Sequence, residues 1–120
     1  MKYTWLKNHL LSKKGTVKEY HDIFGVDRYL VAGKMFAMWG GDKTERPIIT
    51  FKLDPHNGEV LRERFTNVII PGYYMNKIHW NSAYLEGGIP DEVLCSMADE
   101  SYAIIFASLP KKTQQALLSQ

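Results

Sequence analysis

The chain has 120 residues and a formal net charge of +2; 45% of its residues are hydrophobic and 23% are charged. This balance is typical of a folded globular domain and argues against intrinsic disorder. No apolar run approaches the ~18–20 residues of a membrane-spanning helix, and the polar residues near the N-terminus argue against a signal peptide. The single cysteine, Cys95, cannot form an internal disulfide. We therefore expect one domain over residues 1–120, located in the reducing cytoplasm.

Charge is unevenly distributed along the chain. Five lysines precede the first acidic residue, Glu19. A basic end of this kind can attract a polyanion such as nucleic acid through counterion release. The alternative is a solvated lysine face on a surface helix. The sequence alone leaves both interpretations open.

The N-terminal residues predict a short helix. Leu6 and Leu10 have the spacing of one apolar stripe over residues 3–13. Gly15 is placed to end this helix, because glycine accepts the left-handed conformation at a helix end. Residues 16–26 show no clear periodicity, and we expect a loop with a short extended piece there.

A strong β pattern follows. Residues 28–39 hold two apolar runs on either side of Gly33 and Lys34. A Gly-X pair between apolar runs is typical of a type II′ hairpin, in which glycine takes the positive φ at the first central position. Residues 47–53 predict a third strand with strict alternation. That alternation implies one covered face and one partly solvated face, with Thr50 on the solvated side.

A second helix begins at Asp54 and Pro55. The aspartate can accept hydrogen bonds from free backbone N–H groups, and proline at the first helical position loses no bond. We expect this helix to run to about Phe65 and to turn Val60 toward the core. Gly58 inside it is a weak point, since glycine costs roughly 1 kcal/mol relative to alanine in a helix.

The remaining elements complete a mixed architecture. Residues 68–71 and 80–85 predict two more strands, and Pro90 opens a long amphipathic helix. Pro110 ends that helix and starts a short terminal one. The order of helix, three strands, helix, two strands and helix predicts a two-layer α+β fold. We expect its helices on one face of a mostly antiparallel five-stranded sheet.

Several local strings resemble the MmcQ/YjbR family and occur in the family's order. They lie at residues 33–37, 52–55, 61–63, 71–81, 85–92 and 99–102, and PGYYMNKIHWN at residues 71–81 is the strongest. The resemblance covers nearly the whole chain. It implies a small bacterial domain with an α-β3-α-β2-α order, similar to the type III secretion chaperone fold. Proteins of this family are described as "double wing" domains that are predicted to bind DNA.

The resemblance implies a DNA-contacting surface on residues 73–81 and on the hairpin. Under this hypothesis Asn76, Lys77, His79 and Asn81 contact phosphates, and Tyr74 or Trp80 is available to stack on a base. Lys34 would reach a groove from a hairpin tip. Under the structural alternative, the polar groups satisfy an irregular crossing of the chain. That alternative buries the rings of Tyr73 and Trp80 in the core. We expect a mixture of the two, with these rings inside and Lys77 and His79 outside.

A second functional class is a chaperone-like adaptor that presents an apolar surface to a peptide partner. The nearly balanced charge favours this class, whereas the family resemblance favours DNA. We expect no enzymatic activity, no cofactor and no metal site. The four histidines form no i, i+4 or HxH pair, nucleophile and phosphate-loop motifs do not occur, and Cys95 fits a small buried hydrophobe.

Overall fold

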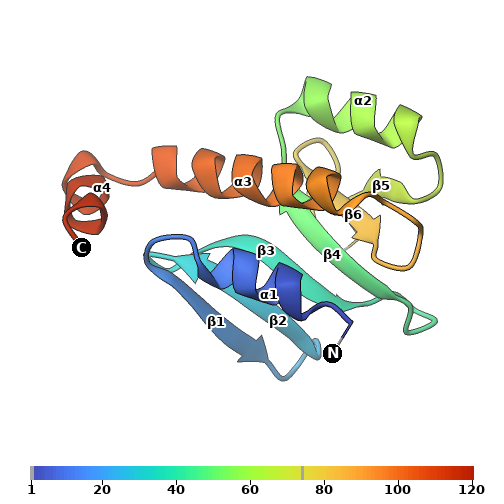
Figure 1. The fold of residues 1–120 in the computed structure, drawn as a ribbon, viewed down its shortest axis with the longest axis horizontal. Coiled ribbons are helices and arrows are strands. Elements are labelled where there is room, and N and C mark those ends of the chain that lie inside the picture. Colours follow the sequence, from blue (N-terminus) through green and yellow to red (C-terminus); the bar gives the residue numbers. More distant parts are fainter. Residues whose placement is uncertain (1, 74) are drawn as a thin grey trace.

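The computed structural model describes residues 2–73 and 75–120 and confirms the two-layer α+β class. The helices are α1 (Thr4–Leu11), α2 (Pro55–Arg64), α3 (Asp91–Ala107) and α4 (Lys111–Leu118). The strands are β1 (Thr16–His21), β2 (Val26–Val31), β3 (Lys34–Gly41), β4 (Pro47–Lys52), β5 (Ile69–Pro71) and β6 (Trp80–Tyr84). They form one antiparallel sheet in the order β1-β2-β3-β4-β6-β5 (Figure 1).

The sheet has six strands where we expected five, because residues 16–21 form a strand and not a loop. β1 pairs with β2 in continuous register, from Thr16 opposite Val31 to His21 opposite Val26. Four of its six residues are exposed, so burial leaves little periodicity in its sequence. The strand is therefore specified by pairing with β2 and not by a buried face of its own.

Helices α1, α2 and α3 lie over one face of the sheet, as expected (Figure 1). Leu6 and Leu10 of α1 are fully buried, and they join the side chains of α3 and of the strands in one core. The stripe expected on α3 is confirmed; its buried residues include Leu94, Met97, Ala98, Ser101 and Ile105. The opposite face of the sheet carries no helix (Figure 1), and we call it the helix-free face.

The β2–β3 turn differs from the expected one. Its central residues are Ala32 and Gly33, with φ angles of 49° and 79°, and Lys34 is the first residue of β3, opposite Val31. Positive φ at both central positions is the type I′ geometry, which matches the right-handed twist of the strands. Lys34 is exposed beside the turn, not at its tip.

A β-bulge interrupts the pairing of β2 with β3. Tyr29 pairs with Ala37 but Leu30 pairs with Met35, so Phe36 is an extra residue in β3. Because of this extra residue, Phe36 and Ala37 are both buried toward the helices. Met35 and Met38 then both lie on the helix-free face, opposite Leu30 and Arg28. Regular alternation would put the two methionines on opposite faces.

The hydroxyl of Ser101 in α3 connects this bulge to the neighbouring strand. It donates to the carbonyl oxygen of Phe36 at 2.5 Å and accepts from the backbone N–H of Lys52 at 2.9 Å. The serine is fully buried. A carbonyl displaced from the ladder by a bulge and an N–H at the end of a strand both need a partner when buried. The Ser101 hydroxyl, in the middle of α3, is the hydrogen-bond partner of both groups.

We predict that Ser101→Ala lowers the free energy of unfolding by about 2–4 kcal/mol, because two buried backbone groups lose their partner. Urea unfolding followed by circular dichroism measures this loss. Ser96→Ala is the matched control, because Ser96 is exposed on the same helix. Equal effects of the two substitutions would contradict the bridging role of Ser101.

Helix α2 packs on the sheet through a glycine. Asp54 accepts from the N–H groups of His56 and Asn57, as expected for its cap. Gly58 is buried, and a Cβ atom there would lie 2.9 Å from Oδ1 of Asn81. Val60, which we expected to face the core, is 48% exposed, because the buried side of α2 runs through Gly58. The glycine thus allows the close approach of α2 to β6.

We predict that Gly58→Ala destabilises the protein by about 1–2 kcal/mol. The cost of overpacking against Asn81 exceeds the roughly 1 kcal/mol that alanine gains in an unconstrained helix. Thermal or urea unfolding of the variant and wild type shows whether the substitution lowers or raises the free energy of unfolding. Glu59→Ala, at an exposed neighbouring position, should leave stability nearly unchanged. A more stable Gly58→Ala variant would show that α2 does not need the glycine.

Candidate functional site

The segment between β5 and β6 folds over the helix-free face of the sheet. The backbone N–H of Tyr73 donates to Oγ of Ser82 at 3.0 Å, and Ser82 hydrogen-bonds Thr50 across the strands at 2.7 Å. Both hydroxyl residues are fully buried. Our expectation of a partly solvated face around Thr50 is therefore wrong, because this segment covers that face.

Three of the six predicted DNA-contacting residues, Asn76, Lys77 and Asn81, form side-chain hydrogen bonds within the protein. Asn76 Oδ1 accepts from the N–H groups of Ile78 and His79, and Lys77 Nζ donates to the carbonyl of Gly72 at 2.7 Å. Asn81 is fully buried and accepts from Arg62 of α2, so its expected place on a surface is wrong.

The other predicted contacts do not form one cluster in the structure. His79 and Lys34 are exposed, the first before β6 and the second at the start of β3. Tyr74 lies outside the described residues. The two ends of the predicted surface thus come from separate parts of the sheet, β6 and the β2–β3 hairpin.

The two rings that we expected in the core are only half-buried. Trp80 pairs with Lys52 on the helix-free face. The Tyr73 hydroxyl accepts from the backbone N–H of Lys43 in the β3–β4 turn at 2.9 Å. These rings cover the sheet from outside the core. For Trp80 the reason is the alternation along β6, which turns Asn81 and Ala83 toward the helices and Trp80 and Ser82 away from them.

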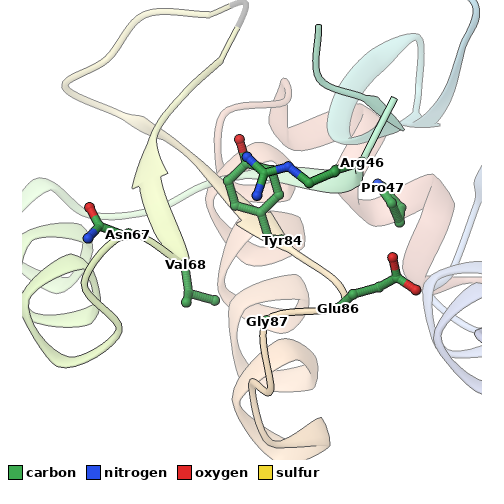
Figure 2. A pocket seen from close by; sticks show the side chains of 7 residues that line it. All are labelled: Arg46, Pro47, Asn67, Val68, Tyr84, Glu86 and Gly87. Carbon is green, nitrogen blue, oxygen red and sulfur yellow. The ribbon is translucent and has the colours of Figure 1, made fainter. Parts of the chain in front are cut away.

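The β3–β4 turn is organised by the carboxylate of Asp42. This group accepts from the backbone and side chain of Thr44, from the backbone and Nε of Arg46, and from the Tyr84 hydroxyl at 2.9 Å. Figure 2 shows the Arg46 guanidinium over the Tyr84 ring, 4.2 Å from its centroid. The adjoining cavity of about 140 Å³ is small for an organic ligand. We interpret the cluster as structural.

The environment of Asp42 predicts an acid-sensitive contribution to stability. Burial alone would raise the pKa of this carboxyl, but hydrogen bonds from Thr44, Arg46 and Tyr84 outweigh burial and hold the pKa well below its usual range. A depressed folded-state pKa stabilises the protein above the unfolded pKa of about 4. This contribution is lost as the pH falls through the folded-state value.

We therefore predict that Asp42→Asn is less stable than wild type at neutral pH and that the difference narrows below about pH 4. Urea unfolding from neutral pH to below pH 4 measures the free energy of unfolding of both proteins. Asp22→Asn, at an exposed position in the β1–β2 turn, is the control and should follow wild type. A difference that stays constant with pH would contradict the assigned role of the carboxylate.

The described residues offer little for metal or nucleophilic chemistry. Residues 2–73 and 75–120 contain no group of three or more His, Cys, Asp or Glu side chains that could hold a metal ion. Burial, followed by the nearby charge of Asp99, raises the pKa of the Cys95 thiol, which makes it a poor nucleophile at neutral pH. Among these residues, no helix is long and apolar enough to span a membrane.

Exposed apolar side chains gather at the outer edge of the sheet, around β1. Val17 is 61% exposed and Tyr20 64%, and in the following turn Ile23 is 82% and Phe24 71% exposed. We call Val17, Lys18, Tyr20 and Ile23 the β1 edge surface. Our sequence interpretation missed it by treating residues 16–26 as a loop. The adjacent apolar pair Ile23-Phe24 in a turn, where large hydrophobic residues are uncommon, was the available signal.

A second apolar feature lies on the helix-free face beside this edge. It is a pocket of about 300 Å³ between the β1–β2 turn and the β5–β6 segment. Its lining residues are His21, Phe24, Val26, Arg28, Met35, Met38 and Met75. We call it the methionine pocket. The β-bulge in β3 places two of its three methionines on this face.

The fold and these surfaces define a small two-layer α+β domain with apolar features at one end of its sheet. The chain belongs to the YjbR family, whose sequence model matches residues 11–104. It is 28% identical over 113 residues to the uncharacterized protein YjbR of Escherichia coli K12, covering 94% of each chain. It is also 32% identical over 89 residues to the uncharacterized protein YbdF of E. coli O157:H7, covering 74% of this chain and 71% of that one.

Solved structures share the architecture. The Deinococcus radiodurans protein DR2400, a DUF419 domain, superposes with a TM-score of 0.83 at 26% identity, over 93% of this chain and 84% of that one. A Pseudomonas syringae protein superposes with a TM-score of 0.74 at 20% identity, over 87% of this chain and 98% of that one. The second likeness concerns the fold alone.

Proposed function

We propose that this YjbR-family domain is a non-catalytic protein-interaction module, and that an extended segment of a partner polypeptide pairs with β1. The supporting observation is the β1 edge surface. β1 is six residues long and ends the strand order, so one of its edges has no strand partner among the described residues. Exposed edges are templates for added strands. Exposed apolar side chains beside such an edge give an added strand something to bury.

The side chains of β1 specify the partner's chemistry. In antiparallel pairing, directly opposed residues share a face of the sheet. The register places Val17 on the helix-free face and Lys18 and Tyr20 on the other face. The partner strand therefore needs an apolar side chain opposite Val17 on the first face, and an apolar one opposite Tyr20 and an acidic one opposite Lys18 on the second. A second copy of this chain fits poorly in the two registers centred on the middle of β1. A two-fold axis centred on Lys18 or on Glu19 would place like charges directly opposite each other.

The DNA-binding hypothesis stays a prediction from the family resemblance. The geometry favours the protein partner, because Asn76, Lys77 and Asn81 are engaged in internal hydrogen bonds. Other cations have internal partners too; Lys13 pairs with Asp99, and Lys14 donates to carbonyls at the C-terminus. Binding that depends on phosphate contacts would weaken steeply with salt, by a log–log slope of about −0.9 per contact.

The test is a selection of peptides on the immobilised domain, followed by affinity measurements on purified variants. A phage library of linear peptides is the probe. We expect selected peptides to bind Tyr20→Glu about tenfold or more weakly than wild type, which corresponds to about 1.4 kcal/mol. Val60→Glu is the matched control, because it introduces the same charge at an exposed apolar position on α2, and it should bind like wild type.

Amide hydrogen exchange separates strand addition from contact through side chains alone. If the peptide pairs with β1, exchange of the outward-facing amides of β1 slows on binding. Selected peptides that bind both glutamate variants as tightly as wild type would contradict the proposal. So would peptides that leave the exchange of β1 unchanged. Salt-sensitive binding of labelled duplex, with no peptide selected, would favour the DNA hypothesis instead.

A further inference from the structure

Residues 17–23, in β1 and the turn after it, read VKEYHDI, and this string is complementary to its own reverse around Tyr20. Each residue before the tyrosine matches the residue at the same distance after it. An acid matches an imidazole, a lysine matches an acid, and one apolar side chain matches another. The pairs are Glu19 with His21, Lys18 with Asp22, and Val17 with Ile23. Two copies placed side by side in opposite directions therefore bring complementary side chains together.

The backbone hydrogen-bonding groups of Tyr20 point away from the sheet. The N–H of Thr16 donates to the carbonyl oxygen of Lys13 at 3.1 Å, outside the sheet. Because these groups point to alternate sides along a strand, those of Lys18 and Tyr20 also point away from β2. The β2–β3 turn agrees with this direction. The residues that flank a two-residue turn hydrogen-bond each other, so Val31 faces β3 and not its partner Thr16 in β1.

A two-fold axis through Tyr20 avoids the like-charge contacts of the registers centred on Lys18 and Glu19. In this register the two tyrosines exchange two backbone hydrogen bonds, and their rings, each 64% exposed, lie side by side. Next to them, Glu19 of each copy lies opposite His21 of the other. These two residues form a non-hydrogen-bonded pair, in which side chains come closest. Arg28 binds Oε1 of Glu19, and a carboxylate accepts further donors such as an imidazole N–H.

The second pair extends the contact into the β1–β2 turn. Asp22 follows β1 directly, and its side chain is exposed. It lies at the same distance from the axis as Lys18 of the other copy. A lysine side chain is long and flexible enough to reach this carboxylate without a regular strand at Asp22. Because the axis repeats each contact, the dimer contains two Glu19–His21 and two Lys18–Asp22 pairs.

From these observations we infer that β1 pairs with β1 of a second copy, antiparallel and centred on Tyr20, and that this dimer regulates access to the β1 edge surface. The two six-stranded sheets join into one, and the free edge of each is covered. The regulatory part rests on the proposed function, since the partner strand needs the same edge. A partner that binds only the free edge competes with the second copy by mass action.

Sedimentation equilibrium of the whole chain measures the dimer. Few residues make the contact, so we expect a dissociation constant on the order of 100 μM. Lys18→Asp and Asp22→Lys each put like charges opposite each other at both ends of the contact, and each should raise this constant about tenfold or more. Lys112→Asp, the same change of charge at an exposed lysine of α4, is the matched control and should dimerise like wild type.

An equimolar mixture of the two charge variants is the decisive measurement. In the mixed dimer one copy carries acids at both positions and the other carries lysines, so every opposed pair is complementary. We expect this heterodimer to form at least as tightly as the wild-type dimer. A wild-type chain that stays monomeric at about 1 mM overturns the inference. A mixture that stays monomeric while wild type dimerises overturns it too.

Competition with a peptide from the phage selection tests the regulatory part. Such a peptide should convert the dimer into monomer–peptide complexes. Peptide binding that leaves the dimer intact would overturn the regulation. The two proposals fail separately. A chain that stays monomeric but binds selected peptides at β1 overturns only the dimer, whereas a chain that dimerises through these charges but selects no peptide contradicts only the proposed function.

Discussion

The arrangement of this domain depends on one irregularity, the bulge at Phe36, and on the buried hydroxyl that satisfies it. The extra residue turns Phe36 and Ala37 toward the helices, where Phe36 meets the ring of Tyr102 edge-on. The same residue displaces a carbonyl from the ladder, and Ser101 hydrogen-bonds it. Because Ser101 also binds the end of β4, α3 is held over the centre of the sheet by polar contacts of fixed geometry. These directional contacts act together with the interdigitated apolar packing of the core.

The bulge also shapes the opposite side of the sheet. It brings Met35 and Met38 to the same face, and the β5–β6 segment adds Met75 above them. That segment is rich in polar groups because it covers the sheet without regular structure. Its backbone amides and carbonyls find partners in Asn76, Lys77 and Ser82. Residues that look like a ligand-binding surface in the sequence are thus hydrogen-bond partners of an irregular cover.

Two apolar features remain exposed at one end of the sheet. The β1 edge surface and the methionine pocket both adjoin the β1–β2 turn, in which Ile23 and Phe24 are exposed. Internal partners occupy several of the basic groups, including Arg28, Lys13 and Lys77. These three groups are therefore less available to an external anion than their charge suggests.

The sequence by itself determined the elements that carry local signals. The Asp54 cap, the stripe of α3 and the strong strands are readable because periodicity and caps act within a few residues. Tertiary structure decided the rest. β1 exists through pairing with β2, the bulge places the methionines on one face, and Asn81 is buried because Gly58 admits α2 beside it. These outcomes depend on contacts between distant segments, whose register and close approach leave no periodic trace in the chain.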